Sequence, residues 1–201
     1  MQPVHHALSA VALALLSASS LASTVTYTSA AAFMPAIAPG AYTENFDGLG
    51  SLPAGPVQFS SGAFSYTISA PGDLYTSGTA IGTNFTDESL TINFTSGNVS
   101  AVGGNFFSTD INDAFRTASI TLTLSDATTV SFAPTSLFDS FRGFTSTALI
   151  TSMTISTAGL PFEGLYASLD NLTVGTVPEP ASLALVGLAL AGIFAVRRRA
   201  A

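Results

Sequence analysis

The stretch TASITLTLSDATTVSF, residues 117–132, alternates apolar and polar side chains with a period of two. Ile120, Leu122 and Leu124 fall on one face of an extended chain, and the serine and threonines between them fall on the other. The SDA break is typical of a hairpin turn, and a valine and a phenylalanine resume the alternation after it. The stretch therefore predicts two antiparallel strands that bury one face.

The same alternation recurs along the middle of the chain, and the segments are AFSYTIS (63–69), SLTINF (89–94), ITSMTIS (150–156) and LYASLDNLTV (165–174). Turn-forming Gly, Pro and Ser-Gly sequences separate them, and no helical period is evident between residues 23 and 176. Short, evenly spaced strands are typical of two packed sheets. We predict an all-β fold, an antiparallel β-sandwich of jelly-roll type, over residues 23–176.

Composition narrows the classes of partner and chemistry. The 201 residues include no cysteine, so a disulfide framework or a thiolate metal site is excluded. Residues 23–176 hold eleven acidic and two basic residues, a formal charge of −9. Such a surface repels nucleic acid and anionic lipid. A neutral sugar, or an acidic polymer bridged by cations, remains compatible with this charge.

Residues 1–22 have the features of a cleaved signal peptide. Ala7–Leu16 has the length of an apolar h-region, and Ser20-Leu21-Ala22 places small residues before a cut after Ala22. His5 and His6 stand where an n-region usually carries arginine or lysine. The alternative is a buried N-terminal helix.

Residues 177–201 have the pattern of a membrane anchor. Residues 181–196 carry no charge, and as a helix they would span about 24 Å against a hydrocarbon core of about 30 Å. Arg197, Arg198 and Arg199 follow directly and would hold their end in the cytoplasm, with the middle of the chain outside. We predict a single transmembrane helix over residues 181–196.

The order of these C-terminal features resembles the PEP-CTERM sorting signal. Val177, Pro178, Glu179 and Pro180 precede the apolar segment, and the arginine cluster closes it. The resemblance implies an exported protein of a Gram-negative bacterium that makes extracellular polysaccharide. It also implies a partner, exosortase, a membrane peptidase or transpeptidase that acts near the Pro-Glu-Pro motif. The alternative is an ordinary C-terminal tail anchor.

The middle of the chain resembles modules of other PEP-CTERM proteins. TENFDGL (43–49), VGGNFFSTD (102–110), FRGFTS (141–146) and LDNLTVG (169–175) carry this resemblance. It implies a concanavalin- or galactose-binding-like β-sandwich, a shape shared by many carbohydrate-binding modules. Likeness of fold does not transfer activity.

Two carboxylates fall on apolar parities of the predicted strands. Glu44 shares the parity of Tyr42, and Asp170 shares that of Leu172 unless a β-bulge at Asp170-Asn171 shifts the phase. An inward carboxylate needs a partner or a proton. If the two strands are neighbours, Glu44, Asp47 and Asp170 could bind a structural Ca²⁺, a cation that takes oxygen ligands. The alternative is that Glu44 and Asp170 lie at strand ends, solvated or bonded to backbone amides.

A second acidic stretch, STDINDAF (108–115), begins like an EF-hand loop. It lacks the glycine and the glutamate that such a loop requires at its sixth and twelfth positions, so we predict a polar loop there.

Catalysis has little support in the sequence. The two histidines lie in the predicted signal peptide, and the chain has no cysteine, lysine or tryptophan. A Ser-His-Asp arrangement and a histidine metal site are therefore not expected in the mature protein. We predict a non-enzymatic surface or matrix protein that associates with exopolysaccharide. The alternative is a secreted polysaccharide hydrolase or lyase that uses a pair of carboxylates.

Overall fold

The computed structural model describes residues 23–50, 55–158 and 164–178, which form two packed antiparallel sheets. The six-stranded sheet has the order β11 (Thr129–Phe132), β10 (Ser119–Leu124), β13 (Ser152–Ala158), β7 (Leu90–Phe94), β4 (Phe64–Ser69) and β3 (Val57–Ser61). The eight-stranded sheet has the order β1 (Thr24–Tyr27), β12 (Phe141–Ser146), β8 (Ala101–Thr109), β14 (Tyr166–Gly175), β6 (Ile81–Thr83) and β5 (Leu74–Thr76), with β2 (Tyr42–Glu44) beside β14 and β9 (Phe115–Arg116) beside β8. The predicted all-β sandwich is confirmed.

The hairpin predicted from residues 117–132 forms as β10 and β11. Leu122 pairs with Val130 and Ile120 pairs with Phe132, so the apolar residues of both strands share one face. That face packs against the eight-stranded sheet and joins the main core. Each fully buried leucine, isoleucine or phenylalanine there contributes about 1.5–3 kcal/mol, which explains why the alternation sets the register.

A short helical segment, which no helical period in the sequence had indicated, crosses the outer face of the eight-stranded sheet. The segment comprises α1 (Ala30–Phe33), capped by the Ser29 side chain, and the 3₁₀ turn η1 (Met34–Ala36). Phe33 is fully buried and lies on two glycines: a Cβ at Gly143 would meet its ring at 2.7 Å, and one at Gly103 at 2.9 Å. Phe33 therefore closes the part of this face over β12 and the start of β8. A second 3₁₀ turn, η2 (Leu137–Asp139), precedes β12.

The last strand carries the β-bulge that its phase slip suggested. Asp170 pairs with Asn105 and Thr173 pairs with Gly103, so β14 has one more residue than β8 between these pairs. Asn171 is exposed, with a φ of 51°. Because of the extra residue, Leu169 and Leu172 both face the core, and Asp170 faces outward rather than toward the apolar side.

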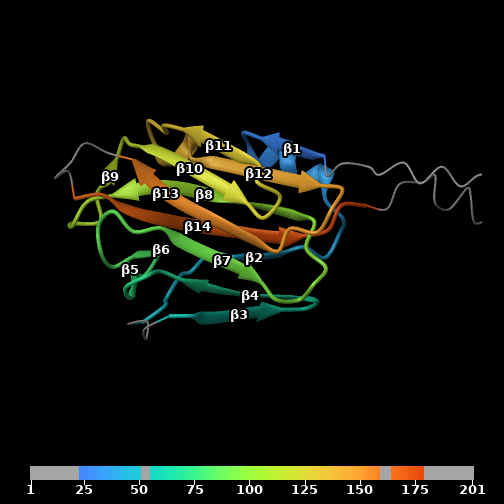
Figure 1. Ribbon diagram of the computed structural model, residues 1–201, viewed down its shortest axis with the longest axis horizontal. Coiled ribbons are helices and arrows are strands. Elements are labelled where there is room, and N and C mark those ends of the chain that lie inside the picture. The colour runs from blue at the N-terminus through green and yellow to red at the C-terminus, as the bar shows by residue number, and fades with distance from the viewer. Residues whose placement is uncertain (1–22, 51–54, 159–163, 179–201) are drawn as a thin grey trace, which may run out of the picture.

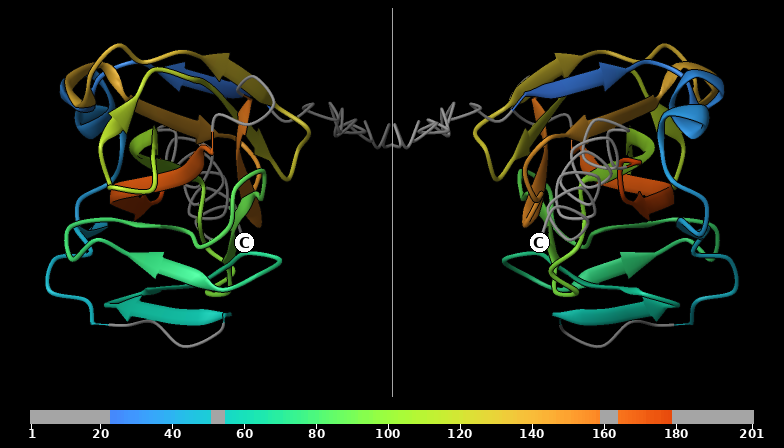
Figure 2. Two further views of the ribbon diagram at one scale, coloured as in Figure 1. Left: turned by 90° about the vertical axis from the view of Figure 1, so that its left-hand side faces the viewer. Right: turned by 90° about the vertical axis from the view of Figure 1, so that its right-hand side faces the viewer.

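Both ends of the described module lie at the same end of the sandwich (Figure 1). The Ser23 carbonyl accepts a hydrogen bond from Thr147 N, just beyond β12, and Val177 N donates to the Ser100 side chain at the start of β8. The strands β5, β6 and β9 lie toward the opposite end (Figure 1). Figure 2 views these two ends, with β1 at one edge and β3 at the other.

Among the described residues, no helix has the length and apolar character needed to cross a membrane. The predicted signal peptide (1–22) and membrane helix (181–196), with Arg197, Arg198 and Arg199, lie outside the described residues, as do Glu179 and Pro180.

Candidate functional site

A groove with a cavity volume of about 400 Å³ lies on the outer face of the eight-stranded sheet, where the α1 segment does not cover it. Its floor consists of outward-facing residues of three adjacent strands, β6, β14 and β8: Gly82, Tyr166, Ser168, Asp170, Asn105 and Phe107. A Cβ at Gly82 would come within 2.7 Å of the Ala167 carbonyl, so glycine is needed for the close approach of β6 and β14. The volume is within the usual range for small-ligand sites.

The walls of the groove present exposed apolar side chains to solvent. Phe138, from η2, is 100% exposed, and Ile111, from the loop between β8 and β9, is 76% exposed. Tyr75, from β5, stands 42% exposed at a third side. Exposed large apolar side chains are costly to solvate, and where they gather they often mark contact surfaces. Their gathering at one groove makes it the strongest candidate for a binding site.

The turn that carries Phe138 is held in shape by Asp139. The Asp139 carboxylate accepts hydrogen bonds from the backbone N–H groups of Thr135 and Ser136 and from both hydroxyls. These bonds, led by the one from Thr135 N, hold the pKa of Asp139 well below its usual value. The Ser140 side chain adds a bond to the Leu137 carbonyl at 2.7 Å. Phe138 is therefore presented on a preformed turn.

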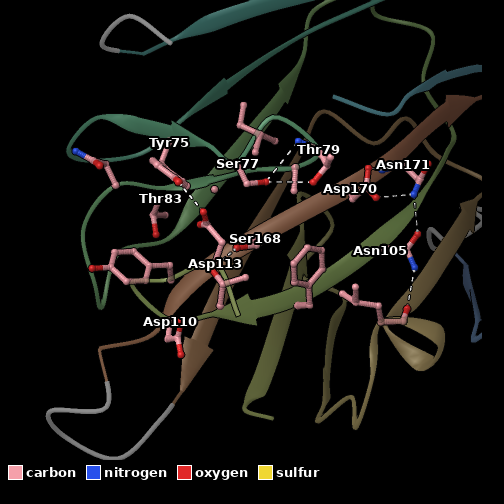
Figure 3. Close-up of a pocket in the computed structure, with 18 of the residues that line it drawn as sticks. Tyr75, Ser77, Thr79, Thr83, Asn105, Asp110, Asp113, Ser168, Asp170 and Asn171 are labelled. Atoms are coloured by element: carbon pink, nitrogen blue, oxygen red, sulfur yellow. Dashed lines mark hydrogen bonds between the residues drawn. The ribbon is translucent and has the colours of Figure 1, made fainter. Parts of the chain in front are cut away.

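An amide and carboxylate network forms one end of the groove (Figure 3). Asn171 Nδ2 donates to Asp170 Oδ2 at 2.8 Å and to Asn105 Oδ1 at 3.4 Å. Asn105 Nδ2 in turn donates to the Ser140 hydroxyl at 3.0 Å, which ties the network to the η2 turn. Burial raises the pKa of Asp170; the hydrogen bond from Asn171 N opposes this shift, and the charge of Asp47 adds to it.

Two further aspartates stand at the other end. The Tyr75 hydroxyl donates to Asp113 Oδ2 at 2.7 Å, and this bond raises the pKa of Tyr75 (Figure 3). Asp110 accepts from the backbone N–H groups of Asn112 and Ala114 and lies 3.9 Å from the Arg116 guanidinium. These contacts shape the loop 110–114, the polar loop expected from the sequence.

The three carboxylates predicted as calcium ligands are not brought together as one set. The strands of Glu44 and Asp170 are neighbours, since Glu44 pairs with Leu172. The Glu44 carboxylate, however, is bonded to its own segment, accepting from the Tyr42 hydroxyl and from Phe46 N. Asp47 is exposed and bonded to Asn45. No three acidic or histidine side chains within the described ranges are grouped closely enough to hold a metal ion. Calcium binding by Glu44, Asp47 and Asp170 stays a prediction.

The sequence analysis did not identify Phe138 and Tyr75, which form walls of the groove, or Asn105, which lies in its floor. Phe138 lies in a turn, where no strand parity marks its direction, and Tyr75 lies in a strand of three residues. The Asn105 position carried a usable signal, because its amide interrupts the apolar run AVGGNFF.

The C-terminal motif begins where the sandwich ends. The Thr176 carbonyl accepts from Ala38 N at 2.8 Å, and Val177 N donates to Ser100 Oγ at 2.8 Å. Pro178 is exposed. Thr176 and Val177, directly before the first proline of the motif, are thus hydrogen-bonded to the sandwich.

Residues 176–199 match the PEP-CTERM protein-sorting motif. The motif indicates an exported protein that is anchored in the membrane and then processed by exosortase, a membrane protein. No curated protein and no solved structure matches the chain. The resemblance of the middle region to concanavalin-like modules is therefore limited to its observed β-sandwich shape.

Proposed function

We propose that the protein is a non-enzymatic surface or matrix protein of a Gram-negative bacterium that binds exopolysaccharide, as in a biofilm, through the groove. Exosortase processing would release it from the inner membrane, where its C-terminus faces the cytoplasm. The observation that carries the proposal is the fully exposed Phe138 ring at the rim of a groove with a polar floor.

The chemistry of the groove suits a sugar. A sugar ring has an apolar C–H face, which packs on aromatic rings such as those of Phe138 and Tyr75. It also has hydroxyls at its edge, which hydrogen-bond with amides such as those of Asn105 and Asn171. Small-ligand sites commonly combine mostly apolar walls with a few placed polar groups, as this groove does.

A glycan array tests the proposal, with affinities for the best ligand measured by calorimetry. The Phe138→Ala variant should lose at least about fivefold in affinity, as expected when an aromatic ring that packs on a sugar face is removed. Its thermal unfolding should not change, because the ring is fully exposed. Leu149→Ala is the matched control, since Leu149 is 55% exposed and lies outside the groove. Wild-type affinity in the Phe138 variant would contradict the role of the groove.

The sorting step is tested separately. The intact mass of the exported protein, from cells with and without exosortase, should show a cut near residues 177–180 only when the enzyme is present. An intact C-terminus in both strains would refute processing.

One observation favours the hydrolase or lyase alternative. Burial raises the pKa of Asp170, as a general acid requires, and Asp113 stands across the groove as a second carboxylate. Release of reducing ends from a bound polysaccharide, abolished by Asp170→Asn, would establish this alternative. Binding without turnover supports the proposal above.

A further inference from the structure

The groove carries negative charge that the protein leaves largely uncompensated. Asp110, Asp113 and Asp170 all line it. Of these, Asp110 alone has a cation beside it, Arg116, and the pair is loose, with 3.9 Å between the charged groups and an exposed arginine. Three carboxylates and one guanidinium leave a charge of about −2 along the groove.

The other arginine of the module is held away from the groove. Arg142 lies over the Phe132 ring, with its Cζ 3.7 Å from the ring centre, on the side of β12 that faces the other sheet. Its Nη1 donates to the carbonyls of Asp139 and Phe141. Residues 23–178 contain no lysine, so within this range no other side chain of fixed positive charge can neutralise the groove.

We propose that the occupant of the groove is an amine-bearing sugar polymer, such as a partly deacetylated hexosamine chain. This inference rests on the proposed function and adds the chemical class of the ligand. An ammonium group supplies three hydrogen-bond donors and a positive charge. The carboxylates of the groove use only some of their lone pairs in hydrogen bonds within the protein, so the others can accept from such a group. The exposed rings of Tyr75 and Phe138 take the faces of the sugar units between the amines. A uronic acid polymer would meet like charge along the whole groove.

The ligand series that tests this uses chitin, chitosan and alginate oligomers of equal length, titrated into the exported protein by calorimetry at mildly acidic pH. The chitosan oligomer should bind at least about fivefold more tightly than the chitin oligomer, and added salt should reduce that difference. The alginate oligomer should not bind.

The protein series uses a closely matched pair of variants. Asp113 and Asp87 both have a φ of 61°, a conformation that asparagine also adopts, and Asp113 lines the groove while Asp87 does not. Asp113→Asn should weaken chitosan binding about two- to fivefold, and adding Asp170→Asn should weaken it further. Asp87→Asn should leave it unchanged. Asp113→Asn should weaken chitin binding less than it weakens chitosan binding, because chitin carries no amine charge.

Each outcome separates this inference from the proposed function. Equal affinity for chitin and chitosan, or equal effects of Asp113→Asn and Asp87→Asn, overturns the amine-bearing ligand and leaves sugar binding intact. Preference for alginate, with or without Ca²⁺, overturns it as well. A module that binds none of the three oligomers and no glycan on the array overturns the proposed function itself.

Discussion

Deleting single residues from β14 tests how the bulge connects the core to the groove. Removing Asn171 restores a regular alternation in which Leu169 and Leu172 still face the core and Asp170 still faces outward. Removing Ser168, three positions earlier, shifts the phase instead. Leu169 then turns outward and Asp170 turns inward, unless the preceding part of the strand flips. We expect the first deletion to be tolerated and the second to be severe.

The magnitudes follow from burial. Leu169 is fully buried, so exposing it costs about 1.5–3 kcal/mol, and turning the Asp170 side chain into the core adds at least 1–3 kcal/mol. Loss of Ser168 should therefore cost about 3–6 kcal/mol. Loss of Asn171 removes its bonds to Asp170 and Asn105 but also relieves a left-handed backbone conformation, for a net change within about 1 kcal/mol.

Thermal unfolding followed by circular dichroism distinguishes the two deletions. For a module of this size the Ser168 deletion should lower Tm by roughly 6–24 °C, and the Asn171 deletion should shift it by less than about 4 °C. The Asn171 deletion should still weaken ligand binding, because the network at the end of the groove loses its central amide. Equal destabilisation by the two deletions would refute the assignment of the bulge.

Three further predictions concern packing and titration. Gly143→Ala should cost about 1–3 kcal/mol in urea unfolding, because the new Cβ would lie 2.7 Å from the Phe33 ring; wild-type stability would contradict this contact. Burial raises the pKa of Tyr42 from 10.0 to about 12, so the stability that Tyr42 contributes is complete below pH 10 and is lost as the pH rises toward 12. A spectrophotometric titration should show that Tyr42 ionises late and together with unfolding. Ionisation of Tyr42 at an ordinary pKa would contradict this prediction. The pKa of Asp139 is lowered from 3.8 chiefly by the hydrogen bond from Thr135 N, so the stability that Asp139 contributes is complete above pH 3.8 and is lost as the pH falls below that value. The NMR shift of the Thr135 amide proton should report this transition, and Asp139→Asn should abolish the transition.

Most of the strands that were predicted have one face in the core. β4, β7 and β10 alternate in burial residue by residue, and the period in the sequence reflects that alternation. β8 was used only as a landmark of resemblance. It is buried on both faces for most of its length, because the α1 segment covers its start, and a strand of this kind has no polar face to create a period.

The periodicity of the sequence could predict neither the α1 segment nor the groove, and the reasons differ. A helix of four residues, AAAF, is too short to show a 3.6-residue period, and its position depends on two distant glycines that accommodate Phe33. The groove collects residues from β5, β8, β14 and η2, which are far apart in the chain and come together only through the strand order. Two local signals fall on its floor: the phase slip at Asp170, and Asn105, whose amide interrupts an apolar run.

The order of features along β14 relates the groove to the sorting motif. The first half of the strand, from Tyr166 to Asp170, lines the groove, and the second half leads to Thr176, where the motif begins. Thr176 lies six positions after Asp170 in extended chain, a distance of about 20 Å. The last described residues before the motif's second half therefore lie at the end of the sandwich away from the groove. We expect ligand binding not to depend on release by exosortase, and the two steps can be measured independently.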